Sequence, residues 1–196
     1  AVTGVAVVIL AVKPQDFENV LLDLAQCLSK KTLVVSIAAG ITSSYIEKFL
    51  GGGIRVIRTM PNMPAVIGEG ITAICRGTFA HKRDIELTCQ IFNRIGETLI
   101  VKENLLDAIT AVSGSGPAYV FLFMECLIKT AKKLGIKQEL AQRLVAATFS
   151  GSVNLFKDRK EDAGILRAKV TSKGGTTQAA MDVFRKNKIE QIIFEA

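Results

Sequence analysis

The stretch TLVVSIAAGITSSYIEKFLGGGIRVIRTMPN, residues 32–62, carries the pattern that decides the fold. Leu33–Ile37 and Ile54–Thr59 are short apolar runs rich in β-branched residues, which are typical of strands. Between them a hydroxyl residue, Thr42 or Ser43, can cap a short helix that three glycines end. A strand, a helix and a second strand in this order predict a βαβ unit with two parallel strands.

The same alternation extends on both sides of this unit. Val5–Ala11 is a continuous apolar run, as expected for a parallel strand covered on both faces, and Asp16 can cap a helix after it. Further along we expect strands at Gly70–Arg76 and Glu97–Val101, joined by a helix over 84–95. Strands separated by helices predict a doubly wound α/β sheet with right-handed crossovers.

The second half of the chain, residues 104–196, has a helical pattern. Ser115-Gly116-Pro117 starts a long helix that Gly135 ends, and a second long helix is expected over 138–156. Both helices carry apolar faces too wide for a lone subunit to bury. We therefore expect an α/β domain in residues 1–103, followed by an all-α oligomerisation domain in residues 104–196.

Composition argues against several classes of protein. The 196 residues are 49% apolar and 22% charged, which is the balance of a globular protein rather than of a disordered chain. The net charge of +7 comes from dispersed Lys and Arg residues without a basic stripe, so we expect no nucleic-acid partner. The longest apolar run, Val5–Val12, is far shorter than the roughly 20 residues that span a bilayer, so we expect no membrane partner.

The four cysteines and the single histidine do not indicate a metal site. Cys27, Cys75, Cys89 and Cys126 include no CxxC pair, and His81 stands in a polar stretch before an expected helix. Isolated thiols in apolar surroundings are typical of a reducing compartment, which indicates a cytoplasmic protein.

Candidate binding residues follow the strands, because a doubly wound sheet binds ligands beyond the carboxyl ends of its strands. The chain leaves the first three strands through Ala11–Pro14, Ile37–Gly40 and Thr59–Pro64. Small residues at such an exit let a flat cofactor approach the backbone, although each exit alone is also ordinary turn material. The dinucleotide pattern GxGxxG is not met, since Gly114-Ser115-Gly116 is followed by Tyr119 in place of the third glycine.

The segment VTSKGGTT, residues 170–177, is the most specific local signal. Two glycines and several hydroxyl residues lead into a helix, so free backbone N–H groups and the positive end of the helix dipole form an anion site. A carboxylate or a phosphate fits such a site, but the lysine precedes the glycines and the P-loop pattern is not met. The alternative is a plain capped turn.

Five motifs together resemble the pyrroline-5-carboxylate reductase family over essentially the whole chain. They are AVKPQ at 11–15, SIAAGI at 36–41, RTMPN at 58–62, SGSGPAYVF at 113–121 and VTSKGGTT at 170–177. The resemblance implies an α/β Rossmann-type nucleotide-binding domain followed by an all-α dimerisation domain. It also implies reduction of 1-pyrroline-5-carboxylate to L-proline with NADPH or NADH, the last step of proline biosynthesis, in a homodimer or higher oligomer.

The same resemblance implies roles for individual residues. A set at the strand exits and the domain junction would line the cofactor: Ala11, Val12, Lys13, Pro14, Ile37, Ala38, Ala39, Asn62 and Glu103. Gly175, Thr176 and Thr177 would hold the substrate carboxylate, with Thr177 as the catalytic residue that hydrogen-bonds the imine nitrogen. A threonine hydroxyl is too weak an acid to deliver a proton unaided, so the proton is expected on the iminium already or from water.

Some positions depart from the family's commoner pattern. Met63 stands where Thr is usual, Lys173 where Pro is frequent, and Asp162-Ala163 where His-Pro is typical. Members begin with two further βα units that carry the glycine-rich pyrophosphate turn and read the ribose phosphate. We therefore expect a partial Rossmann domain from a longer protein, in which NADPH and NADH cannot be distinguished.

Two alternatives stay open. One is a related dehydrogenase acting on hydroxy acids, whose lysine base would lie on the long helix. Lys129 and Lys132 are on that helix, but they lie near its C-terminal end. The other is a non-catalytic dimerising remnant that lost nucleotide binding.

Overall fold

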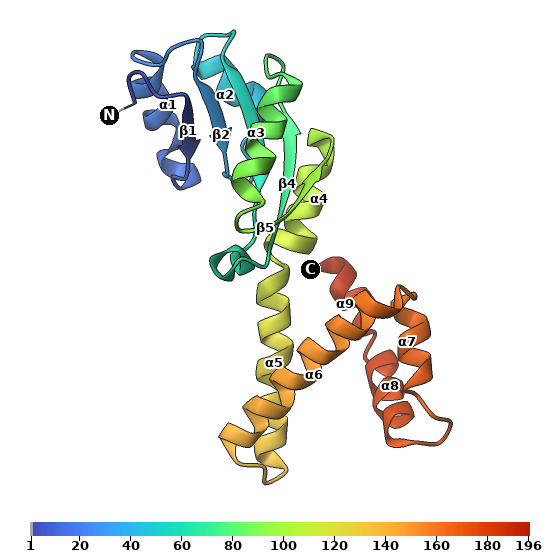
Figure 1. The fold of residues 1–196 in the computed structure, drawn as a ribbon. Helices are drawn as coiled ribbons and strands as arrows, with labels where there is room; N and C mark the ends of the chain where they lie inside the picture. Colours follow the sequence, from blue (N-terminus) through green and yellow to red (C-terminus); the bar gives the residue numbers. More distant parts are fainter. Residues whose placement is uncertain (1) are drawn as a thin grey trace. The chain divides into compact units, whose positions relative to one another are not determined.

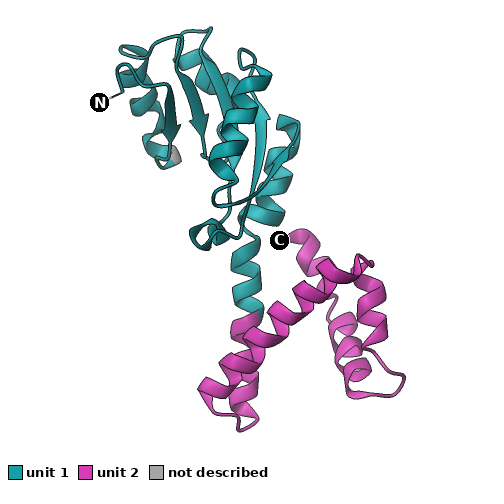
Figure 2. Ribbon diagram, viewed as in Figure 1, with its two compact units in different colours: residues 1–123 teal, residues 124–196 magenta. Residues whose placement is uncertain are grey.

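The computed structural model describes residues 2–196, except for the side chain of Pro14. The chain forms two compact units, residues 1–123 and residues 124–196, which Figure 2 shows in different colours. The units divide inside a helix that begins at Gly116, and the domain boundary expected after residue 103 stays a prediction.

The first unit is built on a five-stranded sheet in the order β1-β2-β3-β4-β5 (Figure 1). The strands are β1 (Val7–Leu10), β2 (Leu33–Ser36), β3 (Arg55–Met60), β4 (Gly70–Arg76) and β5 (Gly96–Ile100). β1, β2 and β3 run parallel, as do β4 and β5, which confirms the strand-helix-strand pattern for these pairs. β3 and β4 pair antiparallel, so the expectation of parallel crossovers throughout is wrong at this step.

The antiparallel step follows from the short connection between β3 and β4. Residues 61–69 hold only the 3-10 turn η2 (Met63–Ile67), whereas a parallel crossover needs a dozen or more residues. Gly68 ends this turn with a φ of +78°, a conformation that favours glycine. The chain therefore turns back and pairs beside the strand that it has just left.

The helices of this unit are η1 (Pro14–Asp16), α1 (Phe17–Ala25), α2 (Ser43–Phe49), α3 (Lys82–Phe92), η3 (Glu103–Leu105), α4 (Leu106–Ile109), η4 (Thr110–Gly114) and the start of α5 (Gly116–Lys133). Four of them, α1, α2, α3 and α5, begin within two residues of where the sequence predicts. Thr42 caps α2 as expected, since its hydroxyl accepts the Tyr45 N–H at 3.2 Å. His81 is the N-cap residue of α3, which agrees with its interpretation as a histidine before a helix.

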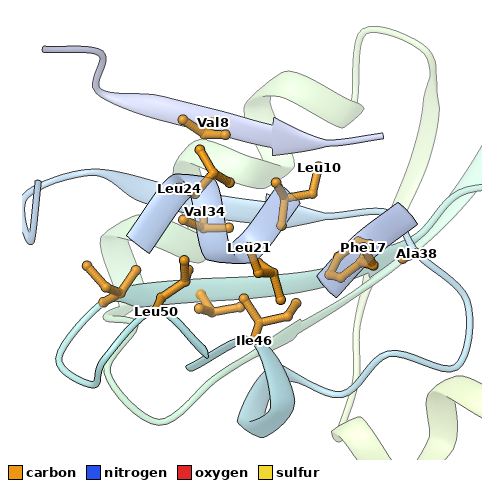
Figure 3. Close-up of a cluster of buried hydrophobic side chains, with 11 residues drawn as sticks. Val8, Leu10, Phe17, Leu21, Leu24, Val34, Ala38, Ile46 and Leu50 are labelled. Atoms are coloured by element: carbon orange, nitrogen blue, oxygen red, sulfur yellow. The ribbon is translucent and has the colours of Figure 1, made fainter. Parts of the chain in front are cut away.

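The two faces of the sheet are buried by different helices. On one face a cluster joins three strands to α1 and α2 (Figure 3): Val8, Leu10, Phe17, Leu21, Leu24, Val34, Ala38, Ile46, Leu50, Ile54 and Val56. On the other face Leu33, Val35, Ile57 and Ile74 pack with Ala80 and Phe92. Neighbouring strand residues point to opposite faces, and this two-sided burial explains why the strands read as continuous apolar runs.

Helical structure continues almost unbroken from Glu103 to Lys133. Leu106 of α4 is fully buried against Ala73 and Cys75 of β4, on the face of the sheet that also carries Arg58. η4 is a single turn of π-helix, in which the Ser115 N–H donates to the Thr110 carbonyl at 2.8 Å, five residues back. Turns of π-helix are rare in proteins overall, but those that do occur often lie at functional sites.

The segment Glu103–Lys133 is also long and apolar enough to cross a membrane by length and composition. A stretch of 18 residues within this segment has a mean hydropathy of 1.4, and none of these 18 residues is buried in the single chain. The apolar side chains of this segment are spread around a helix, so no continuous apolar run in the sequence reveals its length. A helix that is buried between subunits has the same composition.

The second unit contains the end of α5 and four further helices within the described chain. These are α6 (Gln138–Arg159), α7 (Ala163–Lys169), α8 (Thr176–Lys186) and α9 (Ile189–Glu195). The long helix expected from residue 138 is confirmed, and its buried residues are Ala141 and Val145. Glu125, a carboxylate on the apolar helix α5, is half exposed and binds Lys129 at 2.5 Å.

Candidate functional site

The carboxyl ends of β1, β2 and β3 form one edge of the sheet. Leu10 is in register with Ser36, and Ser36 with Arg58, so the three expected strand exits lie side by side. The Ile37 N–H donates to the Leu10 carbonyl at 3.2 Å, and the Thr59 hydroxyl donates to the Ser36 carbonyl at 2.9 Å. The structure therefore brings together the residues that the sequence analysis selected at this edge.

Small side chains leave the backbone of these exits accessible. Most of the selected residues reach the solvent: Ala11, Lys13 and Ala39 are exposed, and Val12 and Ile37 are half-buried. Ala38 is buried, and its N–H donates to the Ser36 hydroxyl at 3.2 Å, which fixes the start of the second exit. Gly40 follows with a φ of +73° and turns the chain toward α2.

Asn62 holds the exit of β3 against two other segments. Its Oδ1 accepts the Ile71 N–H at 2.9 Å, and its Nδ2 donates to the Ser113 hydroxyl at 3.5 Å. Gly114 packs beside this contact, because a Cβ at that position would lie 2.6 Å from the Met60 side chain. The segment Ser113–Gly114 thus packs closely on the exit of β3.

A charged cluster that the sequence analysis missed lies on the same face of the sheet as α2 and α4. Arg58 of β3 is only 3% exposed. Its Nη2 lies 2.9 Å from Asp107 Oδ1 and its Nη1 3.4 Å from Glu103 Oε1. The available signal was an ionised residue inside an apolar strand, since buried charges in proteins are almost always paired.

The Glu103 carboxylate binds the start of α2. Oε1 accepts the Ser43 N–H and Oε2 accepts the Ser43 hydroxyl, both at 2.6 Å. The family resemblance implies that Glu103 lines the cofactor. In the structure both carboxylate oxygens bind the chain itself, which favours a supporting role over direct contact with a ligand.

Cys75 is buried in the same cluster, opposite Arg58 on the neighbouring strand. Burial raises the pKa of its thiol from 9.0 to about 11; the nearby Glu103 carboxylate adds to the rise and Arg58 opposes it. Since the thiolate is the nucleophilic form, this cysteine is inert at neutral pH.

The second group of selected residues forms the N-terminus of α8. Gly174 has a φ of +74°, and Gly175 is the N-cap residue, which offers no side chain to cap the helix. The first hydrogen bond of the helix runs from the Ala179 N–H to the Gly175 carbonyl at 3.2 Å. The N–H groups of Thr176 and Thr177 lie before this bond and have no partner within the helix. These groups point out of the positive end of the helix dipole, as an anion site requires.

Gly175 packs closely against Ser172. A Cβ there would lie 2.5 Å from the Ser172 hydroxyl oxygen and 3.2 Å from the Ser172 carbonyl oxygen. Thr177 is half-buried and Thr176 is exposed. By contrast, the starts of α2 and α7 each have a side-chain cap, from Thr42 and Asp162.

The two groups lie in different compact units. Ala11 to Asn62 and Glu103 belong to the first unit, and Gly175, Thr176 and Thr177 belong to the second. The geometry of each group is established within its own unit. Among residues 2–196 the structure shows no cluster of three or more His, Cys, Asp or Glu residues that could hold a metal ion.

A basic groove of about 780 Å³ lies elsewhere on the first unit. Its lining residues lie before β2, before or at the start of β3, or after β4: Lys30, Lys31, Gly53, Arg55, Thr78, Phe79, His81 and Arg83. Ligands of doubly wound sheets bind at the carboxyl ends of the parallel strands, so we do not assign this groove to the site.

Two protein families match parts of the chain. The family described as pyrroline-5-carboxylate reductase dimerisation matches residues 103–196. The family described as NADP oxidoreductase, coenzyme F420-dependent, matches residues 1–40, which contain β1 and β2.

Individual relatives cover nearly the whole chain. Pyrroline-5-carboxylate reductase from Mycobacterium tuberculosis is 39% identical over 204 aligned residues, which span 92% of this chain and 69% of the relative. The enzyme of the same name from Synechocystis is 40% identical over 190 residues, 97% of this chain and 70% of the relative. The solved structure of pyrroline carboxylate reductase from Plasmodium falciparum with NADP bound superposes with a TM-score of 0.93 at 32% identity, over 97% of this chain and 72% of that one.

Proposed function

We propose that this chain, which belongs to the pyrroline-5-carboxylate reductase family, reduces 1-pyrroline-5-carboxylate to L-proline with a hydride from NAD(P)H, the last step of proline biosynthesis. The observation that carries the proposal is the start of α8, where Gly175, Thr176 and Thr177 offer backbone N–H groups without a side-chain cap. A carboxylate is the anion that this substrate presents. The sequence identity of 39% over 92% of the chain supports the same reaction.

The strand exits of the first unit fit a flat dinucleotide cofactor. Three parallel strands end in register, and the small residues Ala11, Ala38 and Ala39 leave the backbone open to close approach. When bound, NAD(P)H supplies the hydride. We propose that Ala11–Pro14 and Ile37–Ala39 line it and that Asn62 fixes the edge nearest the nicotinamide.

The start of α8 is proposed to bind and orient the substrate. The N–H groups after Gly175 donate to the carboxylate, and the helix dipole favours its negative charge. The Thr177 hydroxyl hydrogen-bonds the ring nitrogen and thereby orients the imine carbon for hydride attack. The proton of the product amine comes with the iminium or from water, because a threonine hydroxyl is too weak an acid to supply it. Most of the rate enhancement then comes from positioning.

The protein is proposed to act as a homodimer or higher oligomer through its helical domain, residues 104–196. α5 has no buried residue in the single chain, and it exposes large side chains such as Phe121, Leu122 and Phe123. The dimerisation family covers this region, so a second copy rather than lipid is the partner that these side chains fit. The four free thiols favour the cytoplasm as its compartment.

The reaction is tested by following the oxidation of NADPH and of NADH by the full-length protein in the presence of 1-pyrroline-5-carboxylate. We expect one proline per cofactor oxidised. Activity with neither cofactor would refute the proposal, and oxidation of hydroxy acids with NAD(P)⁺ instead would support the related dehydrogenase.

The assembly is tested by light scattering on a Phe123→Asp variant, because a buried unpaired carboxylate disfavours association. We expect the wild-type protein to be a dimer or larger and the variant to dissociate. A wild-type monomer would contradict the proposed interface.

A further inference from the structure

We infer that Glu103 is a positioning residue that holds the cofactor-lining loop 37–42 in place through Ser43. The inference deepens the proposed function and rests on it, because it assumes that this loop lines NAD(P)H. It assigns Glu103 to the loop and not to the cofactor itself.

The loop is anchored at both of its ends. At the first end the Ile37 N–H binds the Leu10 carbonyl and the Ala38 N–H binds the Ser36 hydroxyl, at 3.2 Å each. At the far end Ser43 is 3% exposed, and its N–H and its hydroxyl both donate to Glu103 at 2.6 Å. Ala39 and Gly40 between these anchors are exposed, so the path of the middle of the loop depends on both anchors.

Arg58 fixes the Glu103 carboxylate in turn. Arg58 and Glu103 are 45 residues apart in sequence and Ser43 and Glu103 are 60 apart, so only the fold brings the three together. A buried guanidinium needs a partner of opposite charge. Its other partner, Asp107, is 79% exposed, so water can replace that contact far more easily than the contact with Glu103.

Loss of the Glu103 charge should therefore loosen the far anchor of the loop and leave the rest of the sheet intact. The expected consequence is weaker binding of the cofactor with little change in the affinity for 1-pyrroline-5-carboxylate. A residue with a merely structural role would lower the melting temperature without this selective change.

The experiment compares Glu103→Gln, Ser43→Ala and the double variant in the full-length protein. The dissociation constant of NADPH is measured by its fluorescence, and the KM for each substrate and the melting temperature are measured alongside. We expect Glu103→Gln to weaken NADPH binding about tenfold, the size of one charged hydrogen bond. Ser43→Ala should weaken it less, because the backbone N–H of residue 43 still binds Glu103. The double variant should match Glu103→Gln, because Glu103 acts on the loop only through residue 43.

Asp107→Asn is the matched control, since it removes the exposed partner of Arg58 and should leave NADPH binding within about twofold. Unchanged NADPH binding in Glu103→Gln would overturn the inference. Additive effects in the double variant would overturn it too, since they would mean that Glu103 acts on the cofactor independently of Ser43. A wild-type protein that binds NADPH but does not reduce 1-pyrroline-5-carboxylate would refute the proposed function while leaving the NADPH binding comparison valid.

Discussion

Replacing Gly175 with alanine should weaken substrate binding at the start of α8 without unfolding the protein. Gly175 has a φ of −83°, which any residue can adopt, so alanine brings no backbone strain. The added Cβ would, however, lie 2.5 Å from the Ser172 hydroxyl oxygen. Nonbonded heavy atoms prefer a separation of about 3.5 Å, so the turn must open by roughly 1 Å unless the hydroxyl rotates away.

A displacement of about 1 Å at a positioned group costs on the order of 100-fold in rate. Rotation of the Ser172 side chain relieves part of the clash, and the 3.2 Å contact with the Ser172 carbonyl remains. We expect kcat/KM for 1-pyrroline-5-carboxylate to fall roughly 10- to 100-fold, with the KM for NAD(P)H unchanged. Steady-state oxidation of NADPH measures both constants, and light scattering checks that the oligomer is intact.

A second substitution separates this clash from a general effect of alanine. In the double variant Gly175→Ala with Ser172→Ala, the nearest remaining atoms are the Ser172 carbonyl oxygen at 3.2 Å and its Cβ at 3.7 Å. The double variant should regain most of the lost kcat/KM, and Ser172→Ala alone should resemble the wild type. An unchanged kcat/KM in Gly175→Ala would refute the reasoning, as would a double variant no better than the single one.

Three further substitutions test the site, the core and the buried cluster. Thr177→Ala should lower kcat about tenfold through the loss of one hydrogen bond, with the oligomer intact by light scattering; unchanged turnover would remove Thr177 from the mechanism. Leu21 is fully buried, so Leu21→Ala should lower the free energy of unfolding by about 2–5 kcal/mol in urea titrations, and the half-exposed Leu22→Ala should cost far less. Because the pKa of Cys75 rises from 9.0 in the unfolded chain to about 11 in the folded one, its contribution to stability is full below pH 9 and is lost as the pH rises through 11. Between pH 8 and pH 10.5 the free energy of unfolding, measured by urea titration, should therefore fall less for Cys75→Ala than for the wild type. An equal fall in both proteins would contradict the assigned pKa.

Features set by short-range chemistry could be predicted from the sequence. β4 occupies Gly70–Arg76 as expected, and Thr42 caps α2, because apolar alternation and capping depend on residues a few positions apart. The strand exits could also be predicted, because parallel strands present their carboxyl ends at one edge. The glycines before α8 were visible for the same local reason.

Features set by distant residues could not be predicted in the same way. The antiparallel pairing of β3 and β4 depends on the length of the connection 61–69 rather than on the pattern of either strand. The contacts between Arg58, Glu103 and Ser43 join ordinary polar residues that only the completed sheet brings together. The π-turn η4 has no periodic signature, because it adds one residue to an otherwise regular helix.

That extra residue lets this region change its length by one residue. In the π-turn five residues take the place of the four that close a turn of regular α-helix. Deleting one residue from Thr110–Gly114 would therefore restore regular α-helix and leave α5 nearly in its present orientation relative to α4. A deletion between Gly116 and Val120 would instead rotate the residues that follow by about 100° around the helix axis, so that Phe123 would leave the direction in which it now points. We expect natural variants to accept a single-residue deletion in this turn more readily than within α5.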